Sequence, residues 1–157
     1  MSEKSLINIL YVDDEVNNLH SFKAAFRRDF NVFVAESADE GRKILEEQVI
    51  EVIVTDQRMP GMTGVEFLES IIPHYPEPIR ILLTGYTDIQ AVIDAINKGQ
   101  VYHYITKPWD EQQLRNIINK AFEVFNLRAD AYIWATSYAP GTGRLPTATV
   151  NELPPRF

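Results

Sequence analysis

Short apolar segments alternate with amphipathic segments along most of this chain. Five runs are apolar at nearly every position: residues 6–12, 32–35, 49–55, 79–84 and 101–105. Runs of this length without polar alternation are typical of strands that are buried on both faces of a sheet. The segments between them place apolar residues at helical spacing, as in the series Val16, Leu19, Phe22 and Phe26. The pattern predicts a strand followed by a helix, repeated five times.

Capping residues mark several of the predicted helix ends. Four starts carry a Ser, Thr or Asp three positions before a Glu or Gln: Ser37, Thr63, Thr87 and Asp110. This is the spacing at which a side chain accepts a hydrogen bond from the first turn of a helix. Gly99 follows the fourth helical pattern, where a residue with positive φ would close the helix, and Pro73 ends the third.

The alternation of strands and helices also predicts the fold class. Strands joined by helices form a parallel sheet through right-handed crossovers, with helices on both faces. In such an α/β fold a functional site lies outside the carboxyl ends of the strands. Candidate catalytic or ligand-binding residues are therefore expected at that edge of the sheet.

The chain divides into one domain and a tail. Its 157 residues suit a single domain, and the helical pattern fails after about residue 127. The segment 139–146 and the pair Pro154–Pro155 have the Pro and Gly density of a linker. We therefore expect a domain over residues 1–127 and a C-terminal tail or linker over 128–157. The apolar residues Tyr132 to Trp134 could still dock on a surface.

Acidic residues outnumber basic ones. The chain has 22 Asp and Glu against 15 Lys and Arg, a formal net charge of -7. This balance gives no general attraction to phosphate backbones, so direct nucleic-acid binding is not expected. The absence of cysteine excludes disulfides and thiolate chemistry and agrees with a cytoplasmic location. Neither a signal peptide nor a membrane-spanning apolar run is visible, so no membrane contact is expected.

Charged and hydroxyl side chains gather at the predicted strand ends. The set comprises Asp13 and Asp14 after the first strand, Asp56 after the third, Thr84 on the fourth and Lys107 after the fifth. Neighbouring carboxylates repel each other by roughly 1 kcal/mol per pair in water and about 4 kcal/mol near a protein surface. A divalent cation would compensate this repulsion, and a set of oxygen ligands without His or Cys suits Mg²⁺.

Each of these residues also has an ordinary structural explanation. Asp14 could cap the first helix, Asp residues at strand ends commonly form turns, and Lys107 could be a solvated lysine. Five independent coincidences at one edge of a sheet are a weaker explanation than one shared site.

Four motifs in order resemble the receiver domain of bacterial response regulators. They are residues 9–15 (ILYVDDE), 54–64 (VTDQRMPGMTG), 82–85 (LLTG) and 104–108 (YITKP), and the similarity spans about residues 6–126. The resemblance implies a flavodoxin-like, doubly wound five-stranded parallel sheet with strand order 2-1-3-4-5. The segment 57–64 further resembles receivers attached to transcription-activating ATPase modules or cyclic-di-GMP phosphodiesterases.

The resemblance also assigns roles within the site. Asp56 would accept a phosphoryl group from a phosphohistidine of a sensor histidine kinase or phosphotransfer protein, and Thr84 and Lys107 would neutralise the phosphoryl oxygens. It implies four Mg²⁺ ligands: Asp13, Asp14, Asp56 and the backbone carbonyl of Arg58. Such a domain is a phosphoacceptor that assists its own phosphorylation and dephosphorylation rather than an enzyme.

The family's switch maps onto two further positions. Thr84 would move toward phosphorylated Asp56 and Tyr104 would turn inward, which changes the face formed by the fourth helix, fifth strand and fifth helix. That face could also form a phosphorylation-linked homodimer. From the residues alone, Tyr104 is a half-buried strand tyrosine. Arg58 and Tyr86, each two residues after an active position, are expected to slow hydrolysis of the phosphate. The resemblance also implies a cis peptide bond at Lys107–Pro108.

Three other classes of function agree less well with the sequence. A Mg²⁺-dependent aspartyl phosphatase carries its nucleophile in an Asp-x-Asp loop, where this chain has Asp13–Asp14. A phosphorylation-independent interaction domain of the same fold typically loses acidic or lysine positions, and none is lost here. Flavin or nucleotide binding lacks a glycine-rich phosphate loop after the first strand.

Overall fold

The computed structural model of the chain describes residues 6–85, 87 and 89–138, with side chains described up to residue 131. The elements follow in the order β1 (Asn8–Val12), α1 (Val16–Phe26), β2 (Asn31–Ala35), α2 (Ala38–Glu47), β3 (Val52–Asp56), α3 (Gly64–Ile71), β4 (Ile79–Thr84), α4 (Ile89–Asn97), β5 (His103–Thr106) and α5 (Glu111–Tyr138). The strands form one parallel sheet in the order β2-β1-β3-β4-β5. The predicted doubly wound α/β fold and its strand order are confirmed.

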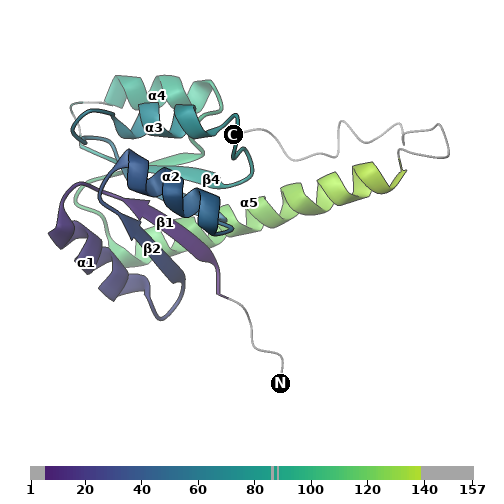
Figure 1. Cartoon of the computed structure of the whole chain (residues 1–157), viewed down its shortest axis with the longest axis horizontal. Coiled ribbons are helices and arrows are strands. Elements are labelled where there is room, and N and C mark those ends of the chain that lie inside the picture. Colours follow the sequence, from purple (N-terminus) through teal and green to yellow (C-terminus); the bar gives the residue numbers. More distant parts are fainter. Residues whose placement is uncertain (1–5, 86, 88, 139–157) are drawn as a thin grey trace.

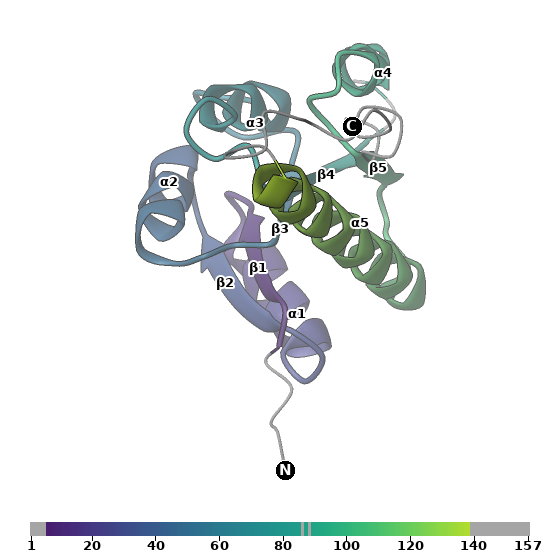
Figure 2. The same cartoon turned by 90° about the vertical axis from the view of Figure 1, so that its right-hand side faces the viewer.

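The sheet separates two apolar layers. On one face, Tyr11 of β1 and Ile81 of β4 pack with buried residues of α1 and α5 such as Phe22 and Ile118. On the other face, buried residues of α2, α3 and α4 cover the alternate positions of the same strands. Figures 1 and 2 show α1 and α5 on one side of the sheet and α2, α3 and α4 on the other. Burial on both faces explains why the central strands are apolar throughout.

The capping signals act largely as predicted. The hydroxyl of Ser37 accepts a hydrogen bond from the Glu40 N–H at 3.2 Å, and Thr63 and Glu66 form a complete capping box. A carboxylate oxygen of Asp110 accepts from the Gln113 N–H at 2.8 Å. Gly99 has φ of 75° and closes α4 as expected. The start of α4 adjoins residues 86 and 88, which lie outside the described part of the chain.

The last helix is longer than the sequence pattern predicts. The pattern predicts an end near residue 127, whereas α5 continues without interruption to Tyr138. The division into a domain and a C-terminal tail stays a prediction. Residues 128–138 contain neither Gly nor Pro and include three alanines, so extending an existing helix costs little. Figure 1 shows the distal part of α5 projecting beyond the rest of the fold. In the described chain, no helix is both long enough and apolar enough to span a membrane.

Candidate functional site

The carboxyl ends of four strands bring the predicted site residues together. Asp13 and Asp14 follow β1, and Asp56 is the last residue of β3. Carboxylate oxygens of these three residues all lie within 4.8 Å of one another. Thr84 ends β4, and the N–H of Lys107 donates to the Thr84 carbonyl at 2.9 Å, which holds the end of β5 beside β4. Parallel pairing thus aligns residues that are far apart in sequence.

The carboxylate of Asp13 is held in place by hydrogen-bond donors from β1 and from the start of α1. Its carboxylate accepts hydrogen bonds from the Tyr11 hydroxyl at 2.6 Å, the Glu15 N–H at 2.9 Å and the Asn18 amide at 3.1 Å. Burial, the Asp13 hydrogen bond and nearby carboxylates raise the pKa of Tyr11, so this hydroxyl stays protonated and donates. Glu15, not Asp14, is the N-cap residue of α1, so Asp14 has no capping role. Asp14 is exposed.

Asp56 is a buried carboxylate, and among the described residues its cationic partner is Lys107. It is 5% exposed and forms an ion pair with the ammonium of Lys107. Burial raises the pKa of Asp56, and the negative charges of Asp13 and Asp14 raise it further, whereas Lys107 lowers it. The net direction is upward. One lysine beside three clustered carboxylates leaves an excess of negative charge at the site, which favours a bound cation.

The three carboxylates fit a hard divalent cation. They supply only oxygen donors, two of them buried and one, on Asp14, open to solvent. A site that offers two or three carboxylates and solvent access suits Mg²⁺, which retains several of its waters. Asp13 Oδ1 accepts one hydrogen bond, from the Glu15 N–H, and keeps a second lone pair for a metal, whereas Oδ2 accepts from both Tyr11 and Asn18.

Thr84 and Tyr104 lie on the same face of neighbouring strands. Thr84 is fully buried and its hydroxyl donates to the Gly85 carbonyl at 3.0 Å. Tyr104 stands opposite Leu82 in the register of β4 and β5, and it is half-buried against the cluster that includes α3 and α4. Leu82 and Thr84 are two positions apart on one strand, so all three side chains share a face.

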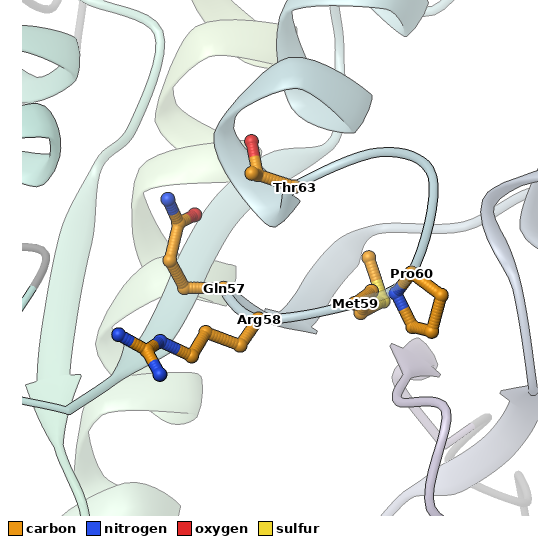
Figure 3. A pocket seen from close by; sticks show the side chains of 5 residues that line it. All are labelled: Gln57, Arg58, Met59, Pro60 and Thr63. Carbon is orange, nitrogen blue, oxygen red and sulfur yellow. The ribbon is translucent and has the colours of Figure 1, made fainter.

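The β3–α3 loop borders a hollow of about 400 Å³ lined by Gln57, Arg58, Met59, Pro60 and Thr63. Figure 3 shows the amide of Gln57 beside the first turn of α3, with the side chain of Arg58 extending away from Met59 and Pro60. The Arg58 guanidinium donates to the Thr87 hydroxyl at 2.9 Å and so links this loop to the β4–α4 loop. Tyr86 lies outside the described residues. The Lys107–Pro108 peptide bond is cis, as the resemblance implied.

Three residues of the site were not identified from the sequence. Tyr11 and Asn18 hold Asp13, and Gln57 is buried beside Asp56. Tyr11 is two positions before Asp13 and therefore on the same side of the strand, which was a usable signal. Asn18 lies in the first turn of α1, where its direction depends on how the helix packs. Gln57 carries no sequence pattern that distinguishes it from a solvated loop residue.

Comparisons with known proteins agree on the family. The family model described as "Response regulator receiver domain" matches residues 9–119. A hydrogenase transcriptional regulatory protein, HoxA of Cupriavidus necator, is 39% identical over 132 residues, which cover 84% of this chain and 27% of that protein. A putative NtrX-like response regulator of Rickettsia bellii is 34% identical over 80% of this chain and 27% of its own length. The chain thus spans about a quarter of these relatives.

Solved structures give the same result. A response regulator receiver domain protein from Clostridium thermocellum superposes with a TM-score of 0.71 at 34% identity, covering 75% of this chain and 95% of that one. A structure described as adenylate cyclase from Rhodopirellula baltica has a TM-score of 0.77 at 31% identity, covering 78% and 92%. Together with the family match, which covers more than half of the chain, these similarities place the protein in the response regulator receiver domain family of two-component systems.

Proposed function

We propose that this chain is a signalling switch that accepts a phosphoryl group on Asp56 from a histidine kinase or phosphotransfer protein. The observation that carries the proposal is the buried Asp56 carboxylate, paired with Lys107 and within 4.8 Å of the Asp13 and Asp14 carboxylates. An Asp56 oxygen would attack phosphorus, the bond from phosphorus to the donor would break, and an acyl phosphate would form. An ionised carboxylate needs no general base for this step.

The other site residues support the transfer by position and charge. The Lys107 ammonium already contacts Asp56, so it is placed to neutralise a phosphoryl oxygen. Asp13, Asp14, Asp56 and the Arg58 carbonyl are the proposed ligands of Mg²⁺. When bound, this ion would neutralise charge on the phosphoryl oxygens. Tyr11 and Asn18 would keep Asp13 in place through their hydrogen bonds.

Thr84 and Tyr104 would convert the phosphate into a change of shape. The Thr84 hydroxyl donates to Gly85 in the present structure, and it would exchange that bond for one to a phosphate oxygen. Tyr104 shares the face of Thr84 and is only half-buried, so it could move into the volume that Thr84 leaves. A phosphate adds a charge of about -1.5 to -2, which supplies the differential stabilisation that such a switch needs. The α4–β5–α5 surface is the proposed output face and the proposed homodimer contact.

Incubation with Mg²⁺ and acetyl phosphate, followed by intact-mass measurement, tests the proposal. We expect one added phosphate per chain in the wild type, none in Asp56→Asn, and little without Mg²⁺. Equal labelling of wild type and Asp56→Asn would contradict the assignment of Asp56. An unlabelled wild type would favour a phosphorylation-independent interaction domain.

The remaining alternative is an aspartyl phosphatase, which the same material can test. A receiver retains one phosphate per chain and releases it slowly, whereas a phosphatase turns over a generic phosphate ester many times. Sustained release of phosphate from such an ester, abolished in Asp56→Asn, would replace the proposed switch by an enzyme. The cytoplasm remains the proposed compartment, where a histidine kinase would deliver the phosphate.

A further inference from the structure

Gln57, the residue directly after Asp56, is buried although it is polar. It is only 4% exposed and belongs to a short set of buried polar or charged residues among the described ones: Asp13, Thr55, Asp56, Gln57, Arg80 and Thr84. Burying an amide costs free energy unless its polar groups find partners. The hydrogen bonds of Gln57 therefore show what its burial achieves.

Gln57 connects three elements of the fold. Its N–H donates to the Leu83 carbonyl of β4 at 2.9 Å, which continues the pairing of β3 with β4 past Asp56. Its carbonyl accepts from the Gly64 N–H at 2.9 Å, and its side-chain oxygen accepts from the Val65 N–H at 2.9 Å. Both acceptors of Gln57 thus serve the first turn of α3.

These two bonds complete the start of α3. The first N–H groups of a helix have no carbonyl partner within the helix and need acceptors from elsewhere. Glu66 and Thr63 serve each other's N–H groups through the capping box, at 3.2 Å each. The Gly64 and Val65 N–H groups between them are served by Gln57 alone, through its carbonyl and its side chain. Gln57 is therefore the residue that fastens the start of α3 to the end of β3.

The attachment is close and leaves little freedom. A Cβ atom added at Gly64 would lie 2.3 Å from the carbonyl oxygen of Asp56 and 2.8 Å from a methyl carbon of Leu82. Real Cβ atoms do not approach backbone atoms so closely. Gly64, the first residue of α3, is therefore packed in direct contact with the Asp56 backbone. The amide of Gln57 lies beside this first turn (Figure 3). A shift of α3 would therefore displace the backbone of Asp56.

We infer that Gln57 is a positioning residue for the phosphorylation site. By accepting the Val65 N–H, its side chain fixes the orientation of the Asp56 carboxylate and of the Arg58 carbonyl, the groups of the residues before and after Gln57. The inference rests on the proposed function, since it concerns the Mg²⁺ ligands assigned there. Residues that orient metal ligands without touching the metal commonly change its affinity about 10- to 100-fold when mutated. Loss of the Gln57 amide should thus weaken Mg²⁺ binding.

The test compares Gln57→Met with two capping variants. Gln57→Met keeps the volume of the side chain and removes the acceptor of the Val65 N–H. Thr63→Ala removes a different side-chain acceptor at the start of α3, the one that serves the Glu66 N–H, so it loosens the same turn and leaves Gln57 intact. Ser37→Ala removes an equivalent acceptor at the start of α2, away from the site. All three lose one capping hydrogen bond of comparable kind.

Calorimetric titration with Mg²⁺ alone is the first readout. We expect Gln57→Met to bind about tenfold more weakly than wild type, and Thr63→Ala and Ser37→Ala to stay within about twofold. Labelling by acetyl phosphate at saturating Mg²⁺ is the second readout, and there Gln57→Met should recover most of the wild-type rate. Should Gln57→Met not fold, Gln57→Asn, with an amide one methylene shorter, takes its place and should show the same loss.

The outcomes separate the two ideas. Unchanged Mg²⁺ affinity in Gln57→Met, with a wild type that binds Mg²⁺ and is phosphorylated, would overturn the role of Gln57 and leave the proposed function standing. An equal loss in Thr63→Ala would also overturn it, since the effect would then come from a loosened helix start. A wild type that neither binds Mg²⁺ nor gains phosphate would remove the proposed function and this inference together.

Discussion

At the level of single residues, the surroundings of Asp56 disfavour the ionised form of its carboxyl group. Burial and the Asp13 and Asp14 carboxylates raise its pKa, and the ion pair with Lys107 offsets only part of this. A carboxyl whose pKa is raised on folding contributes stability below its unfolded pKa of about 4 and loses that contribution as the pH rises through the folded pKa. The ionised form thus destabilises the metal-free protein at neutral pH.

Asp56→Asn should therefore be more stable than wild type at pH 7 without Mg²⁺. We expect its melting temperature to rise by a few degrees, because a neutral amide avoids both desolvation and repulsion. The difference should shrink as the pH falls toward 4, where wild-type Asp56 becomes protonated. Adding Mg²⁺ should stabilise the wild type more than the variant, since only the wild type offers all three carboxylates.

Thermal unfolding followed by circular dichroism at several pH values measures these differences. Asp39→Asn is a suitable control, because the Asp39 side chain is 95% exposed and its ion pair with Arg42 lies at the surface. Its effect should stay within about 0.5 kcal/mol at every pH. A destabilised Asp56→Asn at pH 7 would mean that the Lys107 pair outweighs burial and repulsion.

At the level of elements, two loops meet beside the site. The β3–α3 loop carries Arg58 and the β4–α4 loop carries Thr87, and one hydrogen bond of 2.9 Å joins their side chains. Each loop follows a strand that ends in an active residue, Asp56 or Thr84. The link therefore joins the two loops that follow Asp56 and Thr84, and we expect it to lie in the path of water toward a phosphate on Asp56.

Arg58→Ala should accelerate the loss of phosphate from the labelled protein. The bulky guanidinium is held across the two loops, and removing it opens a path for water. One hydrogen bond of this kind is worth about 0.5–1.5 kcal/mol, so we expect a rate increase of about two- to tenfold. Thr87→Val, which breaks the link but keeps Arg58, should have a smaller effect in the same direction. Decay of the phosphorylated mass with time is the measurement.

The control for this prediction is Arg28→Ala, which removes an exposed arginine from the turn after α1. Its phosphate should decay at the wild-type rate. A rate for Arg58→Ala that is unchanged or slower would contradict the expected role of Arg58. The companion role predicted for Tyr86 concerns a residue outside the described part of the chain and stays a prediction.

At the level of the whole molecule, α5 belongs only in part to the core. Among its described side chains, Leu114, Ile118 and Ala121 are buried, and Val124 and Phe125 pack partly against the same cluster. Beyond them, burial and the charge of Arg128 lower the pKa of Arg80 to about 10, which indicates like-charge repulsion between the two side chains. Residues 126–131, the last of α5 whose side chains the structure describes, add no buried residue to the core.

A chain truncated after residue 127 should still fold and accept phosphate. It keeps the described α5 residues of the core cluster and loses the charge of Arg128 that lowers the pKa of Arg80. We expect a melting temperature within about 4 °C of the full chain, corresponding to about 1 kcal/mol or less. Unfolding curves and labelling by acetyl phosphate measure this. A truncated chain that aggregates or loses cooperative unfolding would show that the domain extends further along α5.

Much of this architecture follows from local patterns in the sequence. Apolar runs and helical spacing predicted all five strands and five helices, because burial on one or both faces depends on periodicity over a few residues. Ser37, Thr63 and Asp110 were predictable as caps, since each bonds a group three residues away. The proximity of Asp13, Asp56 and Lys107 was also predictable from the sequence, because the carboxyl ends of parallel strands meet at one edge of the sheet.

Tertiary structure decided what depends on packing between distant segments. The burial of Gln57 arises because its N–H meets Leu83 of β4 while its side chain meets Val65 of α3, and no local pattern encodes both contacts. The Arg58–Thr87 link depends in the same way on how two loops face each other. The sequence by itself thus determined which residues form the site. The fold determined how far apart they lie, which are buried and what holds them, because those properties depend on strand register and packing.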